Sequence, residues 1–128
     1  MAEHNLIGQR GETLACRFLM QKGYTLIERN WKSNHHEIDI IALHYGLLVF
    51  VEVKTLIGWR HEEALVRVDA QKMKNLIQAA NEYIRLKHLR QPMRFDTITI
   101  TGKEPNLVLN HSIGAFPNNE YHNPPKCP

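Results

Sequence analysis

LLVFVEVKT, residues 47–55, is the stretch of sequence that decides the fold. Its apolar residues run almost without interruption, which is typical of a strand covered on both faces. Glu52 and Lys54 lie two positions apart, so their side chains point to the same face. Charge beside a hydrophobic strand is unfavourable unless it is paired or bound to a metal ion. Such positions concentrate at functional sites, so Glu52 and Lys54 are the first candidate site residues.

A second strand is predicted just before this one, in EIDIIALH, residues 37–44. Tyr45 and Gly46 predict a two-residue hairpin turn between the two strands. Asp39 and Glu52 are equally distant from that turn, so we expect them side by side at roughly 5 Å. Strict alternation would place Ile38, Ile40 and Ala42 on one face of the strand, and Glu37, Asp39 and Ile41 on the other.

Asp39 and Glu52 predict a cation site. Two carboxylates this close repel each other unless a cation lies between them or one of them is protonated. Their oxygens suit Mg²⁺ or Mn²⁺, and the backbone carbonyl of Val53 is available as a further ligand. Lys54, on the Glu52 side, would orient an attacking water and offset charge on a phosphate. Glu12, in the first helix, is expected to reach the site as a supporting acid. The predicted reaction is hydrolysis of a phosphodiester.

The remaining patterns complete an α/β architecture. Apolar residues recur at helical spacing in 6–22 and 69–89, and strand patterns occupy 24–31, 94–101 and part of 107–113. The segment WKSNHH, residues 31–36, is expected to be a polar connection. The strands on either side of the second helix should be parallel, because a helix joins them. The predicted fold is an αβββαβ core whose central mixed sheet is flanked by helices.

Composition limits the class of protein. The chain of 128 residues suits one domain, which we place at 1–116, followed by a Pro- and Asn-rich tail at 117–128 that we expect to be flexible. Two cysteines and no signal-peptide core or membrane span predict a cytoplasmic protein. The net charge of +3 and the pI of about 9.0 favour anionic partners.

An ordered series of motifs carries a family resemblance. Asp39 followed by Glu52-Val53-Lys54 on consecutive strands resembles the PD-(D/E)XK nuclease superfamily. The wider series resembles the YraN-like family of small bacterial proteins, relatives of archaeal Holliday-junction resolvases. It comprises GE (11–12), GY (23–24), ERNW (28–31), EIDIIA (37–42), VFVEVKT (49–55), Lys72 and RFD (94–96).

The resemblance implies a restriction-endonuclease-like fold, catalytic roles for Asp39, Glu52 and Lys54, and a supporting role for Glu12. DNA, including branched DNA, is the implied substrate. A junction-resolving nuclease would form a homodimer, because it makes two cuts related by symmetry. The chain departs from the family pattern at two positions. Relatives usually have Gly where this chain has His36, and they often have Arg where it has Leu56.

Four further residues are expected to contact nucleic acid, namely Thr55, Trp59, Arg60 and Lys72. Two alternatives to a nuclease stay open. One is a nucleic-acid-binding protein that keeps the fold without catalysis. The other is a protein-interaction module in which the acids and Lys54 form a buried ion network. For Asp39 and Glu52 themselves, the alternative to a metal site is a pair of salt bridges with Lys54 or Arg29. A zinc site at His35, His36 and His61 is not favoured, because HEEAL (61–65) lacks the second histidine of a zinc motif.

Overall fold

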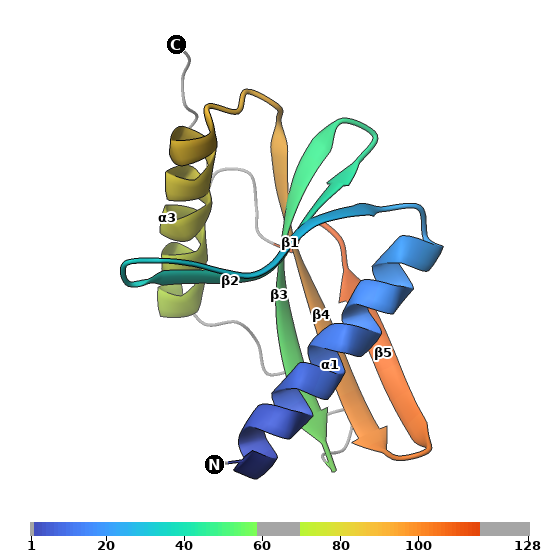
Figure 1. The fold of residues 1–128 in the computed structure, drawn as a ribbon. Coiled ribbons are helices and arrows are strands. Elements are labelled where there is room, and N and C mark those ends of the chain that lie inside the picture. Colours follow the sequence, from blue (N-terminus) through green and yellow to red (C-terminus); the bar gives the residue numbers. More distant parts are fainter. Residues whose placement is uncertain (1, 59–69, 116–128) are drawn as a thin grey trace.

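The computed structural model describes the backbone of residues 2–58 and 70–115, with side chains from residue 6 onward. Its elements follow the predicted order, with a fifth strand at the end (Figure 1). They are α1 (Ala2–Gln21), β1 (Thr25–Ser33), β2 (His36–His44), β3 (Leu47–Ile57), α3 (Ala70–Lys87), β4 (Met93–Lys103) and β5 (Asn106–Ser112). The α/β fold with an αβββαβ core is therefore confirmed.

The five strands form one mixed sheet in the order β1-β2-β3-β4-β5. Only β3 and β4 are parallel, paired from Leu48↔Met93 to Ile57↔Gly102 without a register shift. The helix α3 lies between these two strands in sequence, which is the arrangement that parallel neighbours require. The predicted parallel pair at the centre of the sheet is thus confirmed.

Both turns of the β1–β2–β3 meander contain two residues. At the predicted turn, Tyr45 and Gly46 have φ of 51° and 81°, the left-handed values that suit a tight hairpin. The prediction of a polar connection at 31–36 was wrong. Strands β1 and β2 continue through it to a turn at Asn34 and His35, closed by the pair Ser33↔His36. Asn34 has a φ of 54°, which Asn tolerates better than most residues.

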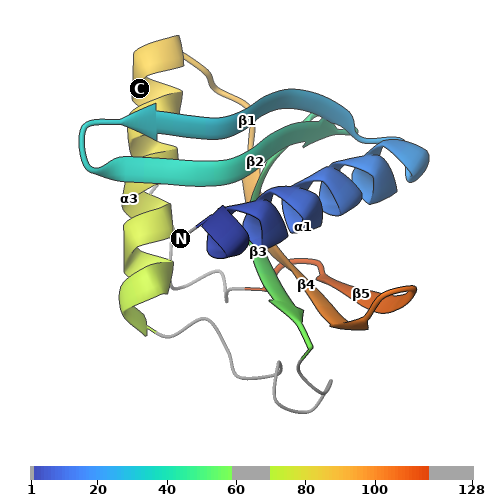
Figure 2. The ribbon, with the colours of Figure 1, turned by 60° about the horizontal axis from the view of Figure 1, so that its bottom comes forward.

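The sheet is covered on both faces, by α1 on one side and by α3 on the other (Figure 2). On the α1 side, Leu19 packs on alternate residues of β3 such as Val49 and Val51. On the α3 side, Tyr83 packs on Phe50 and Phe95. The apolar run in β3 is therefore buried on both faces, as its composition predicts.

The strand β2 does not alternate strictly, and this corrects the predicted face pattern. Ile40 and Ala42 pack on the α1 side, but Ile38 packs with Ile41 on the α3 side. The pairing of β2 with β3 ends at Ile40↔Val51. Beyond that pair, the outer half of the β1–β2 hairpin diverges from β3 and crosses α3 (Figures 1 and 2). We call the opening between β2 and β3 the fork.

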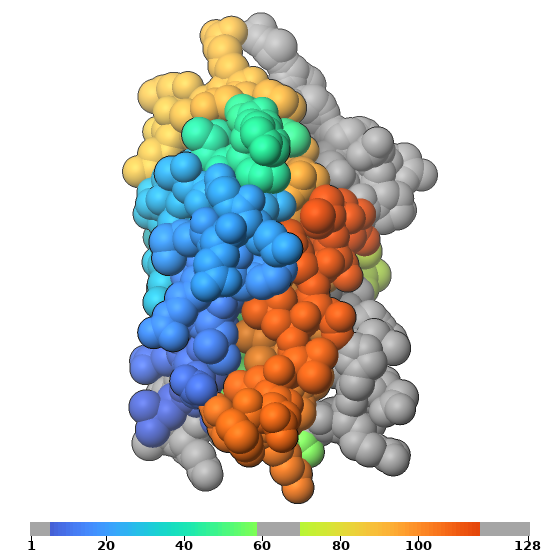
Figure 3. Space-filling model, turned by 90° about the vertical axis from the view of Figure 1, so that its right-hand side faces the viewer, coloured from blue at the N-terminus to red at the C-terminus, as the bar shows by residue number. Residues whose placement is uncertain are grey.

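On the side of the molecule that Figure 3 shows, α1 and β5 lie next to each other. Leu107 and Leu109 of β5 pack against the core beneath α1, and Arg10 forms an ion pair with Glu104 near the β4–β5 turn. Cys16 is buried as a free thiol. None of the described helices is long and apolar enough to cross a membrane. The predicted tail at 117–128 lies outside the described residues.

Candidate metal and nuclease site

Asp39 lies at the fork, where β2 stops pairing with β3. Its Oδ2 accepts a hydrogen bond of 2.8 Å from the backbone N–H of Val53. A residue that faces a neighbouring antiparallel strand directs its N–H and its C=O to the same side. The Val53 carbonyl therefore points into the fork as well, where the β2–β3 ladder no longer occupies it. Asp39 thus contacts the backbone of Val53, and the role of the Val53 carbonyl as a metal ligand stays a prediction.

The environment of Asp39 disfavours its charged form. Burial and the nearby Glu52 carboxylate raise the pKa of Asp39 to about 7, and Glu12 and Glu37 add smaller effects in the same direction. The Val53 N–H opposes them but does not balance them. Among the described residues, no cation pairs with Asp39. A carboxylate in such a place is stabilised in its charged form by a bound cation.

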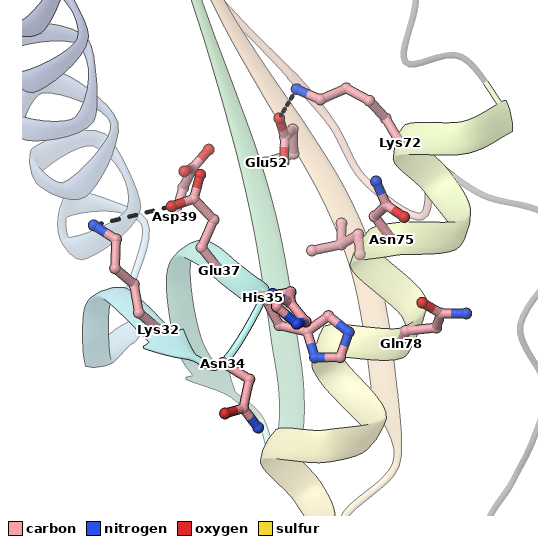
Figure 4. A pocket seen from close by; sticks show the side chains of 11 residues that line it. Lys32, Asn34, His35, Glu37, Asp39, Glu52, Lys72, Asn75 and Gln78 are labelled. Carbon is pink, nitrogen blue, oxygen red and sulfur yellow. Dashed lines mark hydrogen bonds and ion pairs between the residues drawn. The ribbon is translucent and has the colours of Figure 1, made fainter.

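Glu52 extends from β3 toward α3. Its Oε2 lies 2.8 Å from the Nζ of Lys72 at the start of α3 (Figure 4). The Glu52 side chain is 19% exposed and that of Lys72 is 50% exposed. Lys72, which the sequence assigned to nucleic acid, thus lies at the predicted cation site and pairs with one of its acids.

Lys54 and Thr55 lie on opposite faces of β3. Lys54 is two residues from Glu52 on a strand without a bulge, so both point to the α3 side. No ion pair joins Lys54 to another described residue, and it is partly buried. Thr55 faces α1, where a Cβ placed on Gly11 would lie 1.8 Å from the Thr55 Oγ1. Its predicted contact with nucleic acid stays a prediction. In the structure, Thr55 packs closely against Gly11 of α1.

Glu12 approaches the site from α1. Its Oε1 lies 3.6 Å from the Nε of Arg29. The Nη2 of Arg29 donates hydrogen bonds to the Gln9 carbonyl and the Thr13 hydroxyl. Arg29 therefore holds Glu12, and it forms no ion pair with Asp39 in the described part of the chain. The charge of Glu12 still reaches Asp39, because it helps to raise the pKa of that residue.

A cleft of about 620 Å³ extends from the two acids between the β1–β2 hairpin and α3 (Figure 4). Several of its lining residues, Asn75 and Gln78 among them, were not predicted from the sequence. They follow the predicted Lys72 at every third residue of α3, a spacing that places polar side chains near one another on a helix surface. That spacing is the signal that could have identified them. The other lining residues are Lys32, Asn34, His35, His36, Glu37, Asp39, Glu52 and Leu76.

The hairpin wall of this cleft is fixed to α3. Glu82 of α3 lies 2.5 Å from the Nδ1 of His36 and accepts a hydrogen bond of 3.1 Å from the Ser33 hydroxyl. Trp31 and Tyr83 pack edge to face with centroids 5.2 Å apart. His36, which replaces the usual Gly of the resembled pattern, is thus part of the contact that holds the hairpin.

The residues present fit a magnesium or manganese ion in an open site with few protein ligands. Within residues 2–58 and 70–115, no three His, Cys, Asp or Glu side chains converge to form a closed cage. Mg²⁺ commonly uses one or two carboxylates and completes its shell with water and substrate phosphate. Asp39, Glu52 and the Val53 carbonyl match that open type of site. Trp59 and Arg60, also predicted to contact nucleic acid, lie outside the described residues.

Comparison with known proteins places the chain in a family. Residues 11–100 match the model described as "Uncharacterised protein family UPF0102". The chain is 40% identical to a UPF0102 protein of Bacteroides thetaiotaomicron over 116 residues, which cover 91% of this chain and 96% of the relative. It is 37% identical to a UPF0102 protein of Parabacteroides distasonis and 39% identical to UPF0102 protein FP2501 of Flavobacterium psychrophilum, with coverage of 91% of this chain and at least 96% of each relative. The chain therefore belongs to the UPF0102 family, the YraN-like family that its motifs resemble.

Proposed function

We propose that this protein is a metal-dependent nuclease that hydrolyses phosphodiester bonds, with DNA as its substrate. The observation that carries the proposal is the state of Asp39. This carboxylate is partly buried, has acidic neighbours, and lacks a basic partner among the described residues. Acids whose pKa is strongly raised and that lie beside a cleft concentrate at functional sites.

Asp39 and Glu52 would hold Mg²⁺ or Mn²⁺, together with the Val53 carbonyl. When bound, the cation would supply positive charge that polarises a phosphate and acidifies a water molecule. Lys54 would orient the attacking water and offset charge on the phosphate, for which its lack of an ion pair with any described residue leaves it available. Glu12, held by Arg29, would assist from the α1 side.

A specific observation favours a second candidate, a nucleic-acid-binding protein without catalysis. Lys72 already neutralises Glu52 at 2.8 Å, so a metal ion would have to compete with it. Leu56 follows Lys54-Thr55 where many members of the resembled pattern have an Arg. A protein of this second kind would bind nucleic acid with a strong salt dependence and would not cut it.

The experiment that tests the proposal is a cleavage assay on linear, flapped and four-way DNA with Mg²⁺ or Mn²⁺. We expect metal-dependent cutting that falls at least about 100-fold in Asp39→Asn and in Lys54→Ala. Lys103→Ala is the matched control, because Lys103 is exposed at the β4–β5 turn, away from the cleft. Circular dichroism would check that each variant is folded.

The outcomes separate the two candidates. Salt-dependent binding without cutting by the wild-type protein would favour the non-catalytic binder. Cutting that survives in Asp39→Asn and Lys54→Ala would show that the site has been misassigned. A thermal shift with Mn²⁺ that disappears in Asp39→Asn would support the cation site independently of activity. If four-way DNA is preferred, a solution mass of two chains is also expected.

A further inference from the structure

The cleft beside the predicted cation site has two chemically different halves (Figure 4). Glu52 and Lys72 lie at one end, and Asn34, His35 and Gln78 lie farther along the hairpin and α3. From Lys72 to Gln78 the helix advances by about 9 Å, at 1.5 Å per residue. The second half is therefore separated from the acids by about the reach of a nucleotide from its phosphate to its base edge.

The second half offers unused hydrogen-bonding groups. No side-chain hydrogen bond joins Asn34, His35 or Gln78 to another described residue. The Asn75 Oδ1 accepts a hydrogen bond from Gln71, which leaves the Asn75 amide N–H groups directed elsewhere. Carboxamides pair well with base edges because they carry a donor and an acceptor side by side. Imidazole rings can also stack on a base that has left a duplex.

Size favours one nucleotide over a duplex. A volume of about 620 Å³ is that of a small-molecule pocket, whose usual range is about 300–1,000 Å³. The walls are held together by the contacts of Glu82 with His36 and Ser33. A cleft of this size is too small to enclose a duplex, whereas it has room for one unpaired base, as in enzymes that take a base out of the stack.

Charge links the cleft to the cation. Its fully ionised lining contains two lysines, Lys32 and Lys72, and three acids, Glu37, Asp39 and Glu52, which sum to −1. A divalent ion at Asp39 and Glu52 would change that sum to +1. A phosphate is therefore attracted more strongly by the metal-loaded cleft than by the metal-free one.

From this juxtaposition we infer that the cleft receives an unpaired nucleotide next to the cation site. Asn34, Asn75, Gln78 and His35 contact the base, and its phosphate lies toward Lys72 and the metal. The inference rests on the proposed function and names its substrate class, a nucleic acid strand with at least one unpaired nucleotide. A blunt duplex is a poor substrate for this geometry.

The test is a binding measurement with two DNAs that differ by one short flap. Fluorescence anisotropy with Ca²⁺ compares a blunt duplex with the same duplex carrying a flap that contains 2-aminopurine, and gels check that the DNA stays intact. We expect the flapped DNA to bind at least about 10-fold more tightly, and the 2-aminopurine signal to change on binding. A matched RNA flap and free nucleoside monophosphates form two further arms.

The informative variant is Asn34→Gly combined with Gln78→Ala. Glycine keeps the left-handed backbone at position 34, where alanine would be strained. We expect the flap preference to fall about 10-fold while affinity for blunt DNA and the Mn²⁺ thermal shift stay unchanged. Asn106→Ala is the matched control, because Asn106 is an exposed amide at the far β4–β5 turn.

The results test the unpaired-nucleotide site separately from the proposed nuclease function. Metal-dependent cutting with equal affinity for both DNAs, unaltered by the double variant, would overturn the inference and leave the nuclease standing. Failure to bind or cut any nucleic acid would overturn both. Competition by free monophosphates at the concentration of the strand would assign the cleft to mononucleotides instead. A stronger preference for the RNA flap would keep the unpaired nucleotide and change the source to RNA.

Discussion

Asp39 and Asp96 are the two aspartates of the described residues, and their surroundings are opposite. Asp96 is fully buried on the α1 side and accepts two hydrogen bonds of 2.8 Å from Arg94. His111 lies 2.8 Å from the same carboxylate, and the backbone N–H of Gly114 donates at 3.0 Å. Asp39, at the fork, receives one backbone N–H and lies among other acids.

The difference appears in the pKa of each carboxyl group. Burial alone would raise the pKa of Asp96, but the hydrogen bonds from His111, Arg94 and Gly114 together lower it. Burial and Glu52 raise the pKa of Asp39 to about 7. The fully buried Asp96 is thus compensated by its hydrogen bonds, and the partly buried Asp39 is not. The comparison indicates that the α1 side is built for stability, and that the fork keeps a charge imbalance which a cation would remove.

The largest effect is expected from Asp96→Asn. It removes the charge that balances Arg94 inside the core, and breaking such a buried pair typically destabilises by about 3–5 kcal/mol. Because the pKa of Asp96 is lowered by folding, its contribution is present above the unfolded pKa and lost as pH falls through the folded pKa. Urea unfolding of the variant and the wild type at pH 7 measures this loss. A change below about 1 kcal/mol would mean that the network is not structural.

The same substitution at the fork, Asp39→Asn, should raise the free energy of unfolding instead of lowering it. Without divalent cations, Asp39→Asn is expected to stabilise the protein by up to about 4 kcal/mol, the equivalent of a shift from 3.8 to about 7. In the wild type, the contribution of Asp39 to the free energy of unfolding is fully present below pH 3.8, and it is lost as the pH rises to about 7. The advantage of the variant should therefore grow from pH 4 to pH 7 and then stay constant.

Urea unfolding in EDTA across that pH range provides the measurement. Glu37→Gln is a useful control, since Glu37 contributes least among the acids near Asp39 and should recover only a small part of the difference. Adding Mn²⁺ should then stabilise the wild type and leave Asp39→Asn unchanged. An advantage that is independent of pH would contradict the idea that an uncompensated charge causes it.

The contrast between the two aspartates also shows what sequence can predict. The hairpin turn at Tyr45-Gly46 and the apolar run of β3 are local signals, so the order of the strands could be predicted. The position of Ile38 on the α3 side could not, because it follows from a twist set by contacts between the hairpin and α3. The cleft depends on that twist, so its amide residues were not predicted either.

A smaller effect tests how closely the α1 side is packed. Gly11→Ala would place a Cβ within 3 Å of three Thr55 side-chain atoms, and overpacking of this kind costs about 1–3 kcal/mol. Gly8→Ala in the same helix is the matched control, because a Cβ there meets nothing within 4 Å and should stabilise the helix slightly. Gly11→Ala with Thr55→Ala should lose less than the sum of the single variants in thermal unfolding. Additive losses would show that α1 shifts to avoid the contact.

The smallest effect concerns the wall of the cleft, at His36. The Glu82 contact is partly exposed, with side-chain exposure of 28% for His36 and 13% for Glu82. The hydrogen bond from His36 lowers the pKa of Glu82, so the pair is coupled in the folded protein. His36→Ala is expected to lower Tm by about 2–4 °C, and His35→Ala, which breaks no hydrogen bond to a described residue, should change it less.

A double-mutant cycle with Glu82→Gln assigns the effect to the pair rather than to either residue alone. Coupling between the two substitutions would mean that a charged contact fixes the hairpin where it diverges from β3. If the two effects simply add, the hairpin is held by Trp31 on Tyr83, whose rings pack edge to face. The cleft would then owe its shape to the same apolar packing on the α3 side that twists β2 and places Asp39 at the fork, whereas Asp96 lies on the α1 side of the sheet.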